Sequence, residues 1–285
     1  MGDRAGAGGL PWRHAEPVMG TVVSFVLRHR PTPVLRAALA DAVALLHEAD
    51  RVYSPFLPDS AVSRLRRGEP GRADAPSEVR RVLELCERAH SRTRGAFDAW
   101  ADGRPDPCGL VKGWAAERAW RVLREAGATD VCVNAGGDVR VGGAPGPAGV
   151  WRTGIADPRR PGRLLAVVAG RDHAVATSGT AERGAHIVDP RTPAPATGLL
   201  AATVTGPELL WADVYATAAM VLGAAEAHRW IVSKPGYALL AVAADGEARQ
   251  SRAGAESSHP QAWMIADAIP IASPSDKHPQ WPGTP

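Results

Sequence analysis

Two oxygen-bearing side chains stand one helical turn apart in the last third of the sequence. Asp213 and Thr217 are four residues apart in a segment that we predict to be helical, so both side chains project from the same face. A carboxylate and a hydroxyl are the hard oxygen ligands that Mg²⁺ prefers. The spacing therefore favours a cation site. An acid near a helix N-terminus, followed by a threonine that bonds back to a carbonyl, would give the same pattern, and both interpretations stay open.

A glycine pair and a lysine add a second kind of signal. Residues 134–138 read Asn-Ala-Gly-Gly-Asp, which suits either a close approach of backbone to a ligand or the turn of a β-hairpin. Lys112 stands at the start of a predicted helix, where its charge opposes the helix dipole unless an anion or solvent intervenes. His186 suits either a structural role or the same site. Together with the acid–hydroxyl pair, these residues indicate a metal-assisted site for a phosphate-containing ligand.

The composition is typical of a globular protein with a full core. The 285 residues are 45% hydrophobic and 22% charged, which suits one large domain or two closely joined ones. The net charge is +3 and no basic cluster stands out, so we expect no nucleic-acid binding. The cysteines Cys86, Cys108 and Cys132 are isolated, which predicts neither a zinc site nor a disulfide framework.

The first residues carry no recognisable targeting signal. They contain no apolar stretch of a secretory signal, and Gly6 stands where a myristoylation motif requires Ser or Thr. No apolar run approaches the length that a membrane span needs, so we expect no membrane span. From these features we expect a cytoplasmic protein.

The elements that must position these residues alternate between helical and strand patterns. We predict a flexible leader over 1–15, a domain over 16–252 and a disordered tail over 253–285. The predicted helices span 33–50 with Thr32 as N-cap, 77–92 with Ser77 as N-cap, 112–126, 211–222 and 226–233. The predicted strands span 18–27, 131–134, 151–156, 164–169, 174–177, 200–205 and 237–243, with loops over 53–59 and 102–109. This order predicts an α+β fold with mixed or antiparallel sheets and packed helices.

An ordered series of short motifs runs through about residues 16–245. In chain order they are Met19-Gly20-Thr21, Phe56-Leu57-Pro58-Asp59-Ser60, Ser63-Arg64-Leu65, Gly95-Ala96-Phe97-Asp98, Asp106-Pro107-Cys108-Gly109-Leu110-Val111-Lys112-Gly113-Trp114, Asn134-Ala135-Gly136-Gly137-Asp138, Thr177-Ser178-Gly179, His186-Ile187-Val188-Asp189-Pro190 and Ala212-Asp213-Val214-Tyr215-Ala216-Thr217. Each motif is modest, but their order is specific. The series resembles the ApbE-like family of FAD:protein FMN transferases, whose architecture is related to the T-fold.

The resemblance implies an activity and a set of site residues. The family binds FAD and Mg²⁺, transfers FMN to a Thr or Ser hydroxyl of an acceptor protein, and releases AMP. Matching the motifs implies that the metal ligands are Asp213, Thr217 and the backbone carbonyl of Gly109. The implied FAD contacts are Met19, Phe56, Ala96, Phe97, Asp98, Asp106, Lys112, Ile187 and Ala216.

The same resemblance implies a chemical role for Lys112, whose charge would assist Mg²⁺ at the pyrophosphate. The acceptor hydroxyl would attack the FMN-side phosphorus, and AMP would leave. Asp98, Asp138 and His186 are the candidate bases for that hydroxyl, and the sequence does not choose among them. Phe56 and Met19 offer an aromatic and an apolar surface for the flavin ring.

The chain departs from the family pattern at several positions. Phe56 replaces a tyrosine, Ala61 a glutamate and Glu117 an aspartate, while Arg191-Thr192-Pro193 follows Asp-Pro in place of Thr-Gly. The loop between Asp98 and Asp106 is also short. None of these changes falls on the implied metal ligands. Two alternative functions use the same site. The protein could be an FAD pyrophosphatase that gives FMN and AMP, or a non-catalytic flavin-binding protein.

Overall fold

The protein is described by a computed structural model that covers residues 11–69, 71–146, 149–181, 184, 187–252, 262–264 and 269–270. Its centre is an eight-stranded sheet with the strand order β1-β2-β3-β4-β7-β10-β11-β12. These strands are β1 (Trp12–Val18), β2 (Thr21–Leu27), β3 (Val131–Ala135), β4 (Asp138–Gly142), β7 (His173–Gly179), β10 (Leu199–Gly206), β11 (Ala238–Ala243) and β12 (Ala248–Arg252).

A second sheet is built around β6 (Arg163–Gly170). Its other strands are β5 (Trp151–Ala156), β13 (Ala262–Met264) and β14 (Ile269–Pro270), and all of them pair with β6. A short hairpin joins β8 (Val188–Asp189) to β9 (Ala194–Pro195). Every strand pairing in the described part of the chain is antiparallel. The predicted α+β class is therefore confirmed, with antiparallel rather than mixed sheets.

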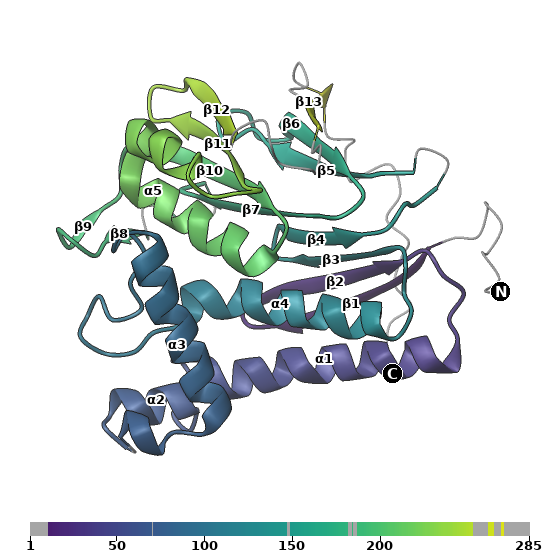
Figure 1. The fold of residues 1–285 in the computed structure, drawn as a ribbon, viewed down its shortest axis with the longest axis horizontal. Coiled ribbons are helices and arrows are strands. Elements are labelled where there is room, and N and C mark those ends of the chain that lie inside the picture. Colours follow the sequence, from purple (N-terminus) through teal and green to yellow (C-terminus); the bar gives the residue numbers. More distant parts are fainter. Residues whose placement is uncertain are drawn as a thin grey trace.

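Helices cover one face of the large sheet, as Figure 1 shows. The helices are α1 (Pro33–Tyr53), α2 (Ala61–Arg66), α3 (Ser77–Arg92), α4 (Cys108–Glu125) and α5 (Leu209–Ile231), with a short 3₁₀ turn, η1, over Arg72–Asp74. Helices α4 and α5 lie on the sheet, and α1 packs against α4. The main core fills this helical layer. A smaller cluster joins β6 to the other face through Val168, Val175 and Leu240.

Most of the predicted elements are present, and their ends differ for identifiable reasons. Thr32 caps α1 as expected, accepting a hydrogen bond from Leu35 N at 3.2 Å. Helix α3, in contrast, has Pro76 at the N-cap and no side-chain cap, so the prediction of Ser77 as cap was wrong. Helix α4 begins at Cys108, four residues before the predicted start, because Pro107 precedes it. Lys112 therefore stands inside the helix and not at its end.

The single strand predicted over 18–27 is two strands. Met19 and Gly20 have φ values of 54° and 67°, and this tight turn reverses the chain between β1 and β2. Strand β1 begins at Trp12, inside the segment predicted as a leader, because pairing with β2 satisfies its backbone. Residues 262–264 and 269–270 of the predicted disordered tail likewise pair with β6. Helix α2 was missed, because it lies between the predicted loop over 53–59 and the predicted helix over 77–92, where no element was predicted.

Helix α5 contains both helical segments that the sequence predicts. They meet at Gly223, where φ 72° and ψ 168° break the helical conformation. By length and composition alone the helix could cross a membrane, in contrast to the prediction that no apolar run approaches the length of a span. However, 67% of its most apolar window is buried inside the protein. This burial is what a core helix would show.

Candidate functional site

Two of the predicted metal ligands, Asp213 and Thr217, lie with Lys112 where α4 and α5 meet the ends of β4 and β7. Lys112 Nζ lies 3.2 Å from Asp213 Oδ2 and also forms a close ion pair with Asp138 Oδ2. Asp138 and Asp213 are 2% and 6% exposed, whereas the Lys112 side chain is 33% exposed. The lysine side chain is therefore the more exposed part of this cluster, and the two carboxylates are its buried part.

Each carboxylate is placed by its own element. Asp138 is the first residue of β4 and directly follows the Gly136-Gly137 turn, whose φ values are +59° and +100°. Its Oδ1 accepts a hydrogen bond from Thr177 N of β7 at 3.0 Å. Of the two interpretations of this motif, the structure shows the turn of a β-hairpin, and this turn delivers Asp138 to the site.

Asp213 and Thr217 lie on the same helix, α5, as predicted. Thr217 Oγ1 shares a hydrogen bond of 3.1 Å with Ser178 Oγ of β7. Gly113 on α4 faces Asp213 so closely that a Cβ there would lie 2.9 Å from Asp213 Cβ. The Lys-Gly motif therefore serves two purposes, because the lysine supplies a charge and the glycine allows the helices to touch.

The buried carboxylates retain unused acceptor capacity. Apart from facing Lys112, Oδ2 of Asp138 and Oδ2 of Asp213 have no hydrogen-bond donor in the described part of the chain. Buried oxygens of this kind are costly unless a cation or donor satisfies them. The described residues hold no group of three or more His, Cys, Asp or Glu side chains that could bind a metal. A metal here would need hydroxyl or backbone oxygens as well, as the predicted set of Asp213, Thr217 and Gly109 provides.

Among the remaining predicted FAD contacts, some side chains are buried in the core and one is exposed. Ala96, Phe97 and Ala216 are 1%, 5% and 0% exposed and belong to the main core, so in this structure their side chains pack against protein. The Phe97 ring lies against Gly109, where a Cβ would be 3.0 Å from Phe97 Cε2. Phe56, by contrast, is 89% exposed on the connection between α1 and α2.

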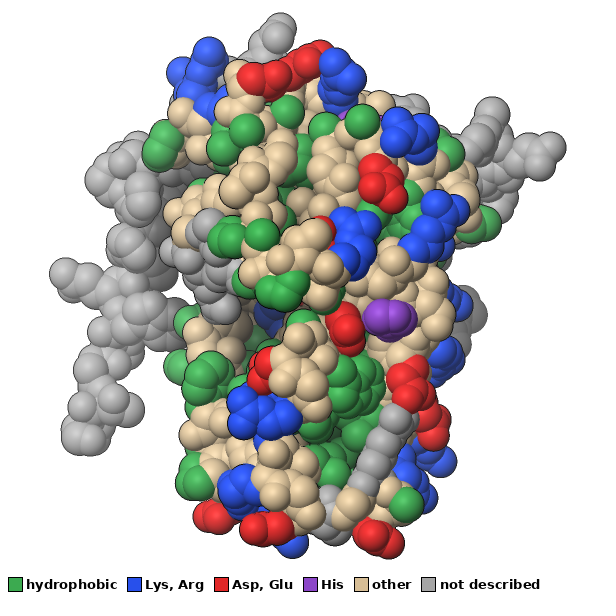
Figure 2. Space-filling view, turned by 90° about the vertical axis from the view of Figure 1, so that its left-hand side faces the viewer, with side chains coloured by type: hydrophobic (Ala, Val, Ile, Leu, Met, Phe, Trp, Pro, Cys, Tyr) green, Lys and Arg blue, Asp and Glu red, His purple; other side chains and the backbone are tan. Residues whose placement is uncertain are grey.

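The polar residues between α3 and α4 mainly order their own loop. Asp98 Oδ1 accepts from Trp100 N at 2.8 Å, and Asp98 Oδ2 lies 3.8 Å from His90 Nδ1. Asp106 Oδ1 accepts from Cys108 N at 3.1 Å, directly before α4. Figure 2 shows the face on this side of the molecule, where hydrophobic side chains line a recess bordered by acidic and basic ones.

The last predicted contacts lie at chain reversals. Met19 occupies the β1–β2 turn and donates its N–H to Asp50 Oδ2 at 3.3 Å. Ile187 is half-buried, and its carbonyl accepts from Ala196 N at 2.8 Å. His186 lies outside the described residues. Met19 and Ile187 are therefore placed by backbone turns and not by the central cluster.

Two charged residues near the site were not identified from the sequence as part of it. Glu117 and Arg140 form a buried ion pair, with Arg140 Nε 3.2 Å from Glu117 Oε2, and they are 4% and 7% exposed. Burial lowers the pKa of Arg140, while the neighbouring Glu117 opposes that shift. A signal for Arg140 did exist, because it follows Asp138 by two residues in a strand and so shares its face.

Comparison with known proteins places the chain in a family. A model of the ApbE family matches residues 19–103 and 101–241. A protein of Thermotoga maritima described as an apbe protein has the same fold, with a TM-score of 0.75 and 21% identity over 85% of this chain and 97% of that one. The fold and the family match agree, and the chain belongs to the ApbE family.

Relatives in this family are named FAD:protein FMN transferase. The one from Klebsiella pneumoniae (strain 342) is 32% identical over an alignment of 146 positions, gaps included, which covers 48% of this chain and 41% of that protein. The one from Treponema pallidum (strain Nichols) is 28% identical over an alignment of 316 positions, gaps included, which covers 84% of this chain and 86% of that protein. The stronger identity thus spans less than half of the Klebsiella relative.

Proposed function

We propose that this protein is a Mg²⁺-dependent FAD:protein FMN transferase that moves FMN from FAD to a Thr or Ser hydroxyl of an acceptor protein and releases AMP. One observation carries the proposal. A buried carboxylate, Asp213, has its Oδ2 3.2 Å from the Lys112 ammonium nitrogen and stands one helical turn from the Thr217 hydroxyl. In a chain of the ApbE family, this arrangement suits the binding of a cation and a pyrophosphate.

The donor set fits Mg²⁺. Asp213, Thr217 and the Gly109 carbonyl would supply a carboxylate, a hydroxyl and a carbonyl oxygen, which leaves positions for phosphate and water. When bound, Mg²⁺ would neutralise the charge that develops across the pyrophosphate. Ser178 would orient the Thr217 hydroxyl through their hydrogen bond of 3.1 Å.

Lys112 would act on the substrate directly. Its side chain is one-third exposed, and its ammonium group is held by ion pairs with Asp138 and Asp213. We propose that it binds a non-bridging phosphoryl oxygen of FAD and keeps the FMN-side phosphorus in place for attack. The exposed Phe56 would stack on the flavin ring at the outer side of the site.

The transfer exchanges the phosphoanhydride bond of the FAD pyrophosphate for a phosphoester bond to the acceptor. The acceptor hydroxyl oxygen forms a bond to the FMN-side phosphorus, while the bond from that phosphorus to the bridging oxygen breaks and AMP leaves with the electron pair. The hydroxyl proton passes to a base, for which Asp98, Asp138 and His186 are the candidates. Of these, Asp138 already stands beside Lys112, whereas Asp98 lies against His90.

The decisive experiment is intact-mass analysis of an acceptor domain with a target threonine after incubation with FAD and Mg²⁺. We expect a mass gain equal to one FMN, dependent on the metal and lost in Asp213→Asn. Asp41→Asn makes the same chemical change at an exposed position of α1 and should leave the yield unchanged. Free FMN and AMP without an acceptor adduct would favour a pyrophosphatase. Unchanged FAD that remains bound would favour a flavin-binding protein.

A further inference from the structure

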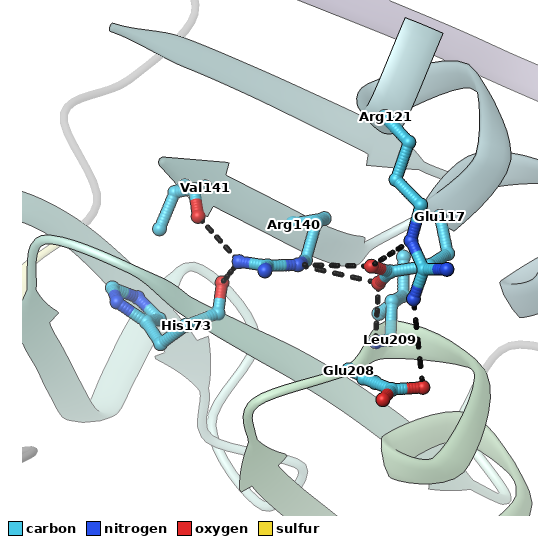
Figure 3. Close-up of polar contacts among 7 residues, drawn as sticks. All are labelled: Glu117, Arg121, Arg140, Val141, His173, Glu208 and Leu209. Carbon is cyan, nitrogen blue, oxygen red and sulfur yellow. Dashed lines mark hydrogen bonds and ion pairs between the residues drawn. The ribbon is translucent and has the colours of Figure 1, made fainter. Parts of the chain in front are cut away.

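We propose that the buried Glu117–Arg140 pair is a positioning device that fixes Lys112, Asp138 and Asp213 relative to one another. This inference rests on the proposed function, because those three residues form the site proposed above. Figure 3 shows the pair and its partners. Both residues are almost fully buried, and their charged groups bind other groups of the protein, so we assign them no contact with substrate.

Glu117 joins α4 to the beginning of α5. Its Oε2 accepts a hydrogen bond from Leu209 N at 2.7 Å and lies 3.2 Å from Arg140 Nε. Leu209 is the first residue of α5, whose N-cap, Glu208, makes no side-chain capping bond. The carboxylate of Glu117 therefore satisfies a free N–H at the positive end of α5 from a neighbouring helix.

Arg140 joins the same carboxylate to the sheet. Its Nη1 donates to the Val141 carbonyl at 2.6 Å and to the His173 carbonyl of β7 at 3.3 Å. The guanidinium also lies 3.8 Å from the centroid of the Trp120 ring on α4. Planar donors of this kind fix the direction as well as the distance of their partners. Strands β4 and β7 are thus tied to α4 through one side chain.

Glu117, Leu209 and Arg140 each lie a few residues from a site residue, on the same helix or strand. Glu117 follows Lys112 by five residues on α4, and Leu209 precedes Asp213 by one helical turn on α5. Arg140 follows Asp138 by two residues on β4, so both side chains leave the same face of the strand. One carboxylate therefore holds together the three elements that supply the three charged groups of the site.

A buried ion pair usually adds little stability compared with an apolar pair of similar size, although breaking one partner is costly. Its presence beneath the site is better explained by geometry, because charged hydrogen bonds fix distances that hydrophobic packing leaves adjustable. We therefore expect the pair to control how well the site binds a cation more than how stable the fold is.

The test uses the full chain and measures binding of Mn²⁺ by electron paramagnetic resonance in the presence of FAD. The variants are Glu117→Gln, Arg140→Met and the double variant. The double variant is decisive, because it leaves no unpaired buried charge. Glu78→Gln is the matched control, since it removes the same charge from an exposed pair with Arg118, the neighbour of Glu117 on α4. Circular dichroism at the assay temperature verifies folding.

We expect the double variant to remain folded and to bind Mn²⁺ about tenfold or more weakly, as is typical when residues behind metal ligands are replaced. Glu78→Gln should bind like the wild type. A folded double variant that binds like the wild type would overturn the positioning role. So would a double variant that does not fold, because the pair would then be a requirement of the fold itself.

Acceptor flavinylation by the same proteins separates this inference from the proposed function. Binding of Mn²⁺ that depends on the pair, without any FMN adduct, would support positioning and contradict the transferase. An FMN adduct formed by the wild type, together with unchanged Mn²⁺ binding in the double variant, would support the transferase and contradict the positioning role. A wild-type chain that binds no Mn²⁺ would contradict both.

Discussion

Lys112 faces two carboxylates that come from different elements, and its environment explains why a lysine is found inside a helix at this point. Asp138 belongs to β4 and Asp213 to α5, so the ammonium group stabilises two buried charges that the fold brings together. At the scale of single residues, the site is thus an electrostatic unit in which each charge depends on the other two.

Removal of the lysine should therefore destabilise the protein as well as inactivate it. In Lys112→Met, Asp138 would remain buried, with Thr177 N as its hydrogen-bond donor among the described residues. We expect a loss of about 1–3 kcal/mol in the free energy of unfolding, measured by urea denaturation. Lys112→Met/Asp138→Asn should regain part of that loss, and purely additive effects would contradict this coupling.

Gly113 makes a prediction of a different kind, because it acts through its missing side chain. A Cβ at this position would lie 3.0 Å from Asp213 Oδ2 and 3.2 Å from the Leu209 carbonyl, which is backbone and cannot rotate away. Gly113→Ala should force α4 and α5 apart, cost about 1–3 kcal/mol and reduce FMN transfer.

Urea denaturation and the acceptor mass assay check this expectation for Gly113→Ala. Gly71→Ala is the control, since a Cβ there would come no closer than 3.4 Å to Asp74 Oδ2. Equal effects of the two substitutions would show that contact between the helices at Gly113 is unimportant.

At the scale of elements, the β3–β4 hairpin determines where the site begins. Its two glycines have positive φ, yet only Gly136 is also confined, because a Cβ there would lie 2.5 Å from Thr21 Oγ1. Gly137 has open space around it and donates its N–H to Asn134 Oδ1 at 2.8 Å. The close approach at Gly136 is thus to strand β2.

We therefore predict that alanine substitutions at the two glycines of this turn destabilise the fold to different extents. Alanine at either position is strained, because both residues have positive φ, which glycine adopts easily and alanine does not. Only at Gly136 would the added Cβ also collide with Thr21. We expect Gly136→Ala to be the more destabilising by about 1–2 kcal/mol in urea denaturation. Thr21→Ala should relieve part of that excess. If Thr21→Ala instead has the same effect in both backgrounds, the collision is not the cause.

At the scale of the whole molecule, one buried histidine links stability to pH. His173 is fully buried, and burial together with the charge of Arg140 lowers its pKa from 6.5 to about 4. The folded protein therefore keeps His173 neutral where the unfolded chain takes up a proton. The contribution of His173 to the free energy of unfolding is therefore fully present above pH 6.5, and it is lost as the pH falls from 6.5 to about 4.

The expected size follows from the pKa difference. Each pKa unit corresponds to about 1.4 kcal/mol, so the loss should reach about 3 kcal/mol at most between pH 7 and pH 4. Urea denaturation of the wild type and of His173→Gln across this pH range isolates the effect of the histidine. The carboxylates titrate in both proteins, so their effect on stability cancels in the difference. We expect the advantage of the wild type to shrink as the pH falls. A constant difference would rule out this source of acid sensitivity.

Local patterns in the sequence determined much of this protein. Alternating and helical periodicities located most strands and helices, Thr32 fixed the start of α1, and Gly-Gly defined the hairpin before Asp138. The spacing of Asp213 and Thr217 placed them on one helix. These features depend on neighbours within a few residues, so the order of the chain is sufficient to reveal them.

Long-range packing decided the rest. The sequence could not show that Asp138 and Asp213 share Lys112, that Glu117 reaches Leu209 N across 92 positions, or that residues 262–264 return to pair with β6. Nor did it show that Ala96, Phe97 and Ala216 are buried. Such contacts arise only when hydrophobic burial brings separate elements together, because no local periodicity records which distant group will satisfy a buried charge.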